Sequence, residues 1–166
     1  MDKIYFQNIN RDDLSELLIW YKNADEFLFA TGIDRQATDT EIESKLFEEE
    51  NLDNQIFDWI CIKDTNERIG IIKGFYKEKE KVLWIKTLMI KPEYQSKGYG
   101  TKAFEKITQN NFEINKVYIS VLSDNIKGLN FWNSLGFMPM NEANKTVLLD
   151  GKNKKIMIMY KVFTKA

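Results

Sequence analysis

Two glycines near the middle of the chain, Gly98 and Gly100, lie between a strand-like run and an amphipathic run. The apolar segment 82–90 ends before them, and a helical pattern begins at Gly100. A helix that begins after a glycine-containing loop presents backbone N–H groups without intrahelical partners, and its dipole adds about half a positive charge there. Glycine also lets a ligand approach the backbone closely. The segment 95–102 therefore predicts a binding site for phosphate or pyrophosphate.

Two well-known phosphate loops do not fit this segment. A Walker loop requires Gly-Lys-Ser/Thr, whereas residues 100–102 read Gly-Thr-Lys. The spacing Gly-x-Gly-x-x-Ala over 98–103 matches the relaxed dinucleotide fingerprint, but there the first glycine follows the strand directly and an acidic residue comes about 20 positions later. Here residues 91–97 intervene, and the segment 117–120 contains no acid. The glycines therefore indicate an anion site of another kind.

The composition predicts one folded domain over residues 1–166. Of the 166 residues, 43% are apolar, which is enough for a core without disulfides or a structural metal. The 24 basic and 25 acidic residues nearly balance, so we expect no nucleic-acid partner. The single cysteine, Cys61, lies in an apolar run, which favours a small buried residue in a reducing compartment over a nucleophile.

The chain contains no histidine. This excludes Ser-His-Asp and Cys-His catalytic pairs, an imidazole base and histidine metal ligands, and we expect no metal. Polar residues interrupt any apolar run at the N-terminus, and no stretch is long enough to span a membrane. We therefore expect a cytoplasmic protein without a membrane partner, either a monomer or a homodimer.

Hydrophobic periodicity and capping residues predict the order of the elements. Asn10, Thr38 with Glu41, and Asn125 are expected to cap helices, and Gly136 is expected to end the last helix in a left-handed conformation. The helices are expected after residues 10, 38, 100 and 125. The expected strands are 3–9, 55–63, 68–76, 82–90, 116–122, 137–140 and 155–163.

The connections between these elements predict the fold class. Short polar breaks join the strands from 55 to 90 as an antiparallel meander. The strand 82–90, the following helix and the strand 116–122 predict a parallel crossover. We therefore expect an α+β fold of order βααβββαβαββ, with a mixed, mainly antiparallel central sheet of about seven strands flanked by helices.

Two longer segments carry a resemblance to a known family. Residues 88–100 read Leu-Met-Ile-Lys-Pro-Glu-Tyr-Gln-Ser-Lys-Gly-Tyr-Gly, and residues 125–137 begin Asn-Ile-Lys-Gly-Leu-Asn-Phe-Trp and end Gly-Phe. Together, in this order, they resemble the acetyl-coenzyme-A-binding motif and the downstream motif of GCN5-related N-acetyltransferases. The element order also matches that family's acyl-CoA N-acyltransferase fold from the first strand to the last.

The resemblance implies a set of residues that bind acetyl-CoA. Backbone groups of Leu88, Met89 and Ile90 would bond the pantetheine arm, and the N–H of Leu88 is the expected oxyanion partner. Asn125 would bond the pantetheine portion as well as cap its helix, and Phe131 and Trp132 would pack against the cofactor. The pyrophosphate would be held by the backbone of Gln95, Ser96, Lys97, Gly98, Tyr99, Gly100 and Thr101.

The sequence departs from the family at the general acid. The position that usually holds tyrosine is Trp132, and an indole N–H is no practical acid. Acetyl transfer from acetyl-CoA releases the CoA thiolate. Either water or another tyrosine protonates this thiolate, or it leaves without an acid, since thiols ionise near pH 8 to 9. Lys86 and Thr87 are the residues expected to point inward near the thioester, where a general base would lie. Neither has a carboxylate, so no general base is identified.

The resemblance also implies the reaction. It implies an acetyl-CoA-dependent N-acetyltransferase that moves an acetyl group directly to a primary amine of a small molecule or a protein N-terminus. The departure at Trp132 leaves an alternative, a non-catalytic acyl-CoA-binding or regulatory module on the same fold. Four acidic and aromatic residues are candidates for the acceptor site: Asp25, Glu26, Phe29 and Trp84.

Overall fold

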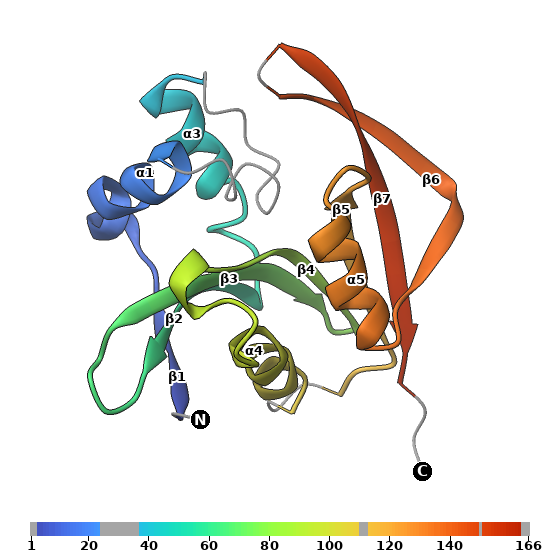
Figure 1. Cartoon of the computed structure of the whole chain (residues 1–166), viewed down its shortest axis with the longest axis horizontal. Coiled ribbons are helices and arrows are strands. Elements are labelled where there is room, and N and C mark those ends of the chain that lie inside the picture. The colour runs from blue at the N-terminus through green and yellow to red at the C-terminus, as the bar shows by residue number, and fades with distance from the viewer. Residues whose placement is uncertain (1–2, 24–36, 110–112, 150, 164–166) are drawn as a thin grey trace.

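The computed structural model describes residues 3–23, 37–109, 113–149 and 151–163. Seven strands form one sheet in the order β1-β2-β3-β4-β5-β7-β6 (Figure 1). The strands are β1 (Ile4–Asn8), β2 (Gln55–Ile62), β3 (Arg68–Lys77), β4 (Val82–Ile90), β5 (Lys116–Leu122), β6 (Met138–Leu149) and β7 (Lys152–Val162). The helices are α1 (Leu14–Asn23), α3 (Asp39–Leu46), α4 (Tyr99–Thr108) and α5 (Ile126–Ser134), with short 3₁₀ turns η1 (Arg11–Asp13) and η2 (Pro92–Tyr94). The predicted α+β fold class is confirmed.

The predicted helix caps form as expected. Asn10 and Asp13 make a capping box, although the turn they begin is the 3₁₀ turn η1, which leads into α1. Thr38 accepts a hydrogen bond from the N–H of Glu41 at 3.2 Å and so begins α3. Gly136 has a φ of +91°, the left-handed conformation that ends α5 without strain.

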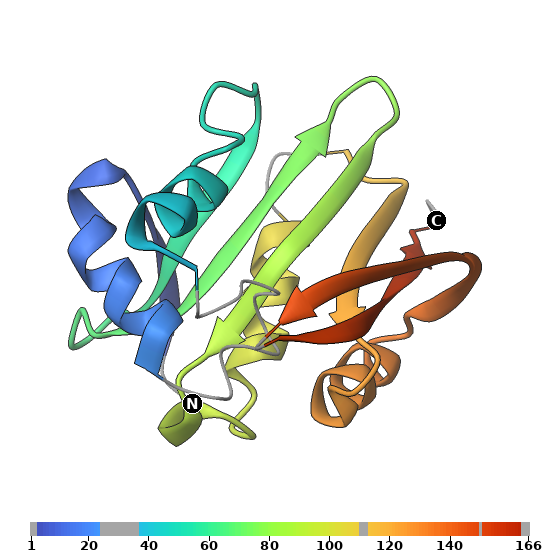
Figure 2. The ribbon, with the colours of Figure 1, turned by 90° about the horizontal axis from the view of Figure 1, so that it is seen from above.

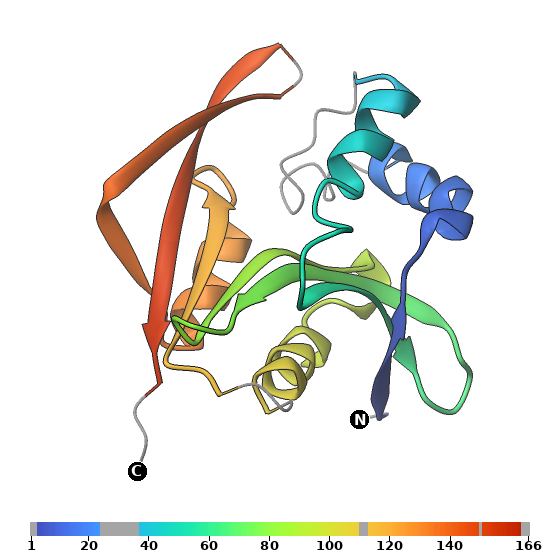
Figure 3. The same ribbon diagram turned by 180° about the vertical axis from the view of Figure 1, so that it is seen from behind.

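Helices cover both faces of the sheet, and each face buries its own core. Figures 1 and 3 show α1 and α3 on one side of the strands and α4 on the other. The α4 face buries residues such as Ile60, Phe104 and Phe137. The α1 and α3 face buries a second cluster that includes Trp59 and Cys61. Burial raises the pKa of the Cys61 thiol, in keeping with the prediction of an unreactive core residue.

Strand β4 has two paired neighbours at its start but only one beyond Ile85. It pairs antiparallel with β3 throughout, but its predicted parallel pairing with β5 covers only Val82–Ile85 against Lys116–Ile119. Where the β4–β5 ladder stops, the register with β3 also shifts: Lys73 pairs with Thr87 but Gly74 pairs with Ile85. One residue of β4, Lys86, is therefore extra, and such a bulge bends and twists the strand.

Gly74 is required on the strand that faces this bulge. A Cβ atom at this position would lie 2.0 Å from the carbonyl oxygen of Trp84, and that oxygen belongs to the backbone. Any side chain would therefore push β3 and β4 apart at the point where β4 leaves β5.

The C-terminal hairpin is longer than the sequence predicted. We expected strands only over 137–140 and 155–163, whereas β6 and β7 pair as far as Leu149 with Lys152 (Figure 2). Residues 141–146 read Asn-Glu-Ala-Asn-Lys-Thr, a polar segment with low strand propensity, and pairing with β7 overrides that propensity. The Asp-Gly pair at 150–151, typical of hairpin turns, was the available signal.

We expect Gly74→Ala to lower the free energy of unfolding by about 3 kcal/mol, because the new methyl group overlaps a backbone atom that cannot move independently. The control is Gly151→Ala, where φ is +75° but nothing lies within 4 Å of the added Cβ atom. Its cost should be only the left-handed backbone penalty of about 1 kcal/mol. Urea unfolding followed by tryptophan fluorescence measures both, and equal losses would contradict the close approach at Gly74.

Candidate active site

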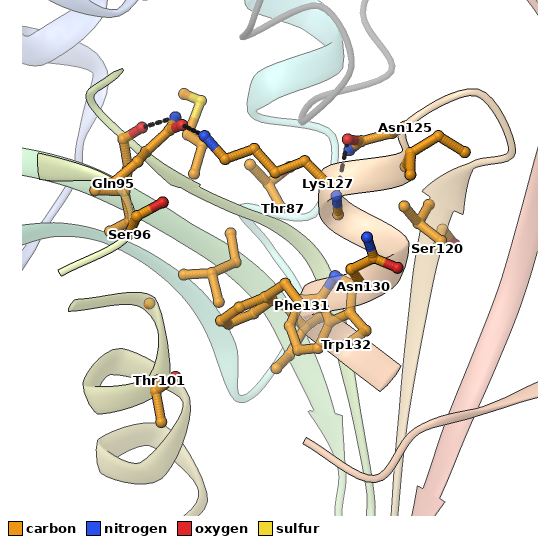
Figure 4. A pocket seen from close by; sticks show the side chains of 18 of the residues that line it. Thr87, Gln95, Ser96, Thr101, Ser120, Asn125, Lys127, Asn130, Phe131 and Trp132 are labelled. Atoms are coloured by element: carbon orange, nitrogen blue, oxygen red, sulfur yellow. Dashed lines mark hydrogen bonds between the residues drawn. The ribbon is translucent and has the colours of Figure 1, made fainter. Parts of the chain in front are cut away.

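A cavity of about 720 Å³ opens where β4 and β5 separate. Its walls come from β4 beyond Ile85, the loop that follows β4, the start of α4, the end of β5 and the start of α5 (Figure 4). This volume is in the usual range for a small-molecule or cofactor site.

Most of the residues implied by the family resemblance meet in this cavity. Neither Lys97 nor Tyr99 is among its lining residues: the Lys97 ammonium lies 5.8 Å from the Tyr94 ring, and Tyr99 is buried in the α4 core. Trp84 lies outside the cavity on β4, and the acceptor candidates Asp25, Glu26 and Phe29 lie outside the described residues. The lining includes Leu88, Met89, Ile90, Gln95, Ser96, Gly98, Gly100, Thr101, Asn125, Phe131 and Trp132.

The N-terminus of α4 forms one end of the cavity. Gly98 is the cap residue with a φ of +88°, and the first intrahelical bond runs from the Lys102 N–H to the Gly98 carbonyl at 3.0 Å. The N–H groups of Gly100 and Thr101 come before that bond and have no acceptor within the helix. No acidic side chain lies in the first turn to offset the helix dipole. This end of the cavity can therefore hold an anion.

Gly100 keeps this helix end open. A Cβ atom there would lie 3.2 Å from the ring of Phe131, on the opposite wall of the cavity. That contact is tighter than most Cβ contacts, so any other residue at position 100 would require the Phe131 ring to shift by a few tenths of an ångström.

A hydrogen-bonded bridge joins the loop to α5. The Gln95 side chain donates to the Ile90 carbonyl at 2.8 Å and accepts from the Lys127 ammonium at 2.6 Å (Figure 4). The bridge fixes the loop against the end of β4 and brings a positive charge to the cavity wall. Sequence reasoning missed Lys127, because nothing in its local sequence shows that it lies opposite Gln95.

The oxygen and the nitrogen of the Asn125 side-chain amide have different roles. Its oxygen accepts the Gly128 N–H at 2.9 Å and caps α5, as predicted. A Cβ on residue 128 would lie 2.4 Å from the Asn125 nitrogen, so the glycine there leaves room for this amide. The amide nitrogen stays a donor on the cavity wall.

Trp132 belongs to the core as well as to the cavity. Only 7% of the residue is exposed, and its ring meets those of Phe104, Phe131 and Phe137 edge to face at 4.9 to 5.9 Å. Such edge-to-face contacts are the favoured geometry for aromatic pairs. The indole therefore fills the base of the cavity between α4 and α5.

Four charged side chains gather beside the bulge of β4. The Lys86 ammonium bonds Glu48 at 2.8 Å and also bonds Glu49, and Glu49 is paired with Lys73 at 3.2 Å. Burial by itself lowers the pKa of Lys86, but the hydrogen bonds that its ammonium donates to the two carboxylates, together with their negative charges, outweigh burial and raise the pKa. Burial lowers the pKa of Lys73 by more than Glu49 raises it. Lys86 therefore stays protonated and positively charged at the cavity wall.

Carboxylates are scarce around the cavity. Among the described residues that line it, the only one is Asp124, which pairs with Lys154 at 2.7 Å. Asp58 lies on β2 and is not among the lining residues, and burial raises its pKa.

Two further findings concern the described part of the chain. No three side chains of the types His, Cys, Asp and Glu come together there as a possible metal site. None of the helices there has the length and hydropathy needed to cross a membrane.

Solved structures with a similar fold include acetyltransferases. Spermidine N-acetyltransferase from Vibrio cholerae, in complex with CoA and spermine, matches with a TM-score of 0.74 at 16% identity, covering 96% of this chain and 95% of that one. An acetyltransferase from Thermus thermophilus matches with a TM-score of 0.72 at 16% identity, covering 95% and 98%. A dodecameric structure of the Vibrio cholerae enzyme in an intermediate state matches with a TM-score of 0.68 at 15% identity, covering 96% and 93%.

Identities this low show the fold alone. No curated protein sequence matches the chain significantly. The profile of the acetyltransferase (GNAT) family, however, matches residues 14–137, which is well over half of the chain. The cavity between β4 and β5 lies largely within that match, and the chain belongs to the acetyltransferase (GNAT) family.

Proposed function

We propose that this protein transfers an acetyl group from acetyl-CoA to a primary amine of a small molecule or a protein N-terminus. The observation that carries the proposal is the cavity itself, which joins an anion-binding helix end to a gap in the sheet. A molecule with a pyrophosphate at one end and an amide-containing arm matches both parts. CoA has this composition.

The pyrophosphate is assigned to the N-terminus of α4. The N–H groups of Gly100 and Thr101 and the dipole of α4 favour an anion there, and Lys127 adds a positive charge. The pantetheine arm is assigned to the free side of β4 at Leu88, Met89 and Ile90, where strand pairing to β5 has ended. The Ile90 carbonyl already accepts from Gln95, but other backbone groups on that side have lost β5 as a partner, and the amides of the arm can replace it.

The chemistry requires a neutral amine and a stabilised oxyanion. The amine nitrogen forms a bond to the thioester carbon, the carbon–sulfur bond breaks, and the thiolate leaves with the electron pair. A backbone N–H of β4, assigned to Leu88, would stabilise the oxyanion, and the reactants' fixed positions supply much of the rate. Water takes the amine proton, and the thiolate needs no side-chain acid because its own pKa lies near 8 to 9.

Calorimetric titration with acetyl-CoA, followed by thiol release across a panel of primary amines, tests the proposal. We expect binding at micromolar to millimolar ligand and thiol release with at least one amine. Absence of binding would refute the proposal. Binding without thiol release from any amine would support the alternative of a non-catalytic acyl-CoA-binding module, which Trp132 at the usual tyrosine position motivates.

Gly100→Glu should weaken acetyl-CoA binding by at least about a hundredfold. The new carboxylate would repel the pyrophosphate at the N-terminus of α4 and crowd Phe131. The matched control is Gln109→Glu, which adds the same charge at the other end of α4 and should leave affinity unchanged. Calorimetry measures both, with circular dichroism to verify folding. Equal affinities of the two variants would contradict the assignment of the pyrophosphate.

Two substitutions at Asn125 separate its two roles. Asn125→Asp keeps an equally good helix cap but removes the amide donor, so it should weaken acetyl-CoA binding while stability is retained. Asn125→Ala removes both and should also lower the free energy of unfolding by about 1 kcal/mol. Thermal unfolding and calorimetry distinguish the effects. If Asp binds acetyl-CoA as well as Asn does, the residue serves only as a cap.

A further inference from the structure

A row of aromatic side chains crosses the sheet beside the cavity. Phe75 on β3 pairs with Trp84 on β4, Trp84 pairs with Tyr118 on β5, and Tyr118 pairs with Tyr160 on β7. All four are half-buried. Because directly paired residues share a face of the sheet, the four rings lie on one face in neighbouring strands, and they are named here the aromatic row.

The aromatic row lies on the face of the sheet that carries α1 and α3. Leu83 and Ile85, which flank Trp84, belong to the core on the α4 face, and so do Val117 and Ile119, which flank Tyr118. Side chains alternate along a strand, so Trp84 and Tyr118 project to the other face. In Figure 2 this part of β4 lies between α3 and the β6–β7 hairpin, and no described helix covers it.

The row adjoins the mouth of the cavity. Lys86 and Ser120 line the cavity and follow Trp84 and Tyr118 by two residues in their strands. Two residues of a strand span about 7 Å. An acceptor molecule that approaches the gap between β4 and β5 from this face can therefore contact the row with its non-reacting part while its amine reaches the cavity.

The ring geometry determines what the row can bind. The Trp84 and Tyr118 rings stack with centroids 4.7 Å apart and planes 19° apart, and Phe75 stacks on Trp84 at 6.4 Å and 20°. Neighbouring strands are themselves about 4.8 Å apart, so the ring faces are turned toward one another and the edges point away from the sheet. The C–H edges of Phe75 and Trp84 are electropositive, and they favour the face of another aromatic ring over a cation. Tyr118 and Tyr160 carry a hydroxyl group at the far end of the ring.

Charges near the row also disfavour a polycation. The Lys116 ammonium lies 5.5 Å from the centroids of both Tyr118 and Tyr160 and takes the cation–π position of these rings. Lys86 is a second positive charge at the cavity wall, and its partners Glu48 and Glu49 are already paired with lysines. Additional ammonium groups would meet two positive charges without a free carboxylate among these residues.

We propose that the aromatic row binds the body of the acceptor, and that the acceptor is a primary amine joined by a short linker to an aromatic ring. This inference rests on the proposed acetyltransferase function and narrows its substrate class. The neutral ring would pack on the edges of Trp84 and Tyr118, and a linker of about two carbons would carry the amine past Lys86 and Ser120 into the cavity.

Three amines test this in the thiol-release assay with acetyl-CoA. 2-Phenylethylamine carries the ring, 2-cyclohexylethylamine has the same size without π electrons, and spermidine is a polycation. We expect kcat/KM for 2-phenylethylamine to exceed that for 2-cyclohexylethylamine by about threefold to tenfold. This ratio corresponds to the interaction energy that an aromatic pair usually adds to the burial of apolar area, about 0.5 to 1.5 kcal/mol. Spermidine should be the poorest of the three.

Two variants test whether the preference for 2-phenylethylamine depends on the aromatic row. Trp84→Leu should raise KM for 2-phenylethylamine by about threefold to tenfold and remove its advantage over the cyclohexyl analogue, while acetyl-CoA affinity stays unchanged. Phe6→Leu is the matched control, because Phe6 is a half-buried ring on β1 that packs against the core of the other face. It should change neither acceptor preference nor KM.

The outcomes separate this inference from the proposed function. Thiol release without a preference for the aromatic amine, or with spermidine preferred, would overturn the inference and leave the acetyltransferase proposal standing. If none of the three amines reacts, the wider panel of primary amines decides the proposed function, and calorimetry of 2-phenylethylamine with the protein–CoA complex decides whether the aromatic row binds it. Binding that Trp84→Leu weakens would support the row as a binding surface, and no binding would refute it.

Discussion

The parallel pairing of β4 and β5 ends at Ile85 and Ile119, and the rest of the site depends on that break. Beyond it, backbone groups of β4 that would have paired with β5 line a cavity instead. Buried backbone groups need partners, so a gap of this kind inside a sheet is costly unless a ligand or water satisfies them. The bulge at Lys86 and the close approach of Gly74 to Trp84 accompany the break and turn β4 away from β5.

The break creates a site because a helix end is placed beside it. The loop after β4 returns to the sheet at α4, whose first N–H groups lie at one end of the cavity, and α5 closes the opposite wall. The Gln95–Lys127 bond joins these two walls across the cavity. The site thus combines an anion-binding helix end with a strand that can still form hydrogen bonds. Neither feature alone would distinguish a coenzyme-A site from other phosphate or peptide sites.

Features with local causes were the predictable part of this protein. Asn10, Thr38 and Asn125 cap helices because their side chains bond N–H groups two or three residues away, and Gly136 ends a helix through its own backbone conformation. The hairpin was predicted too short, because β6 depends on pairing with β7 more than on its own propensity. The acceptor candidates Asp25, Glu26 and Phe29 remain predictions, since they lie outside the described residues.

The order of elements, the α+β class and the glycine segment with its downstream motif could all be predicted from the sequence. These are carried by residues close together in the chain, where spacing and propensity act directly. The tertiary structure was needed to show that β4 and β5 part after Ile85, that Lys86 is held by Glu48 and Glu49, and that four aromatic residues pair across the sheet. Each of these is a contact between segments distant in sequence, and strand register, which no single segment encodes, determines which side chains meet.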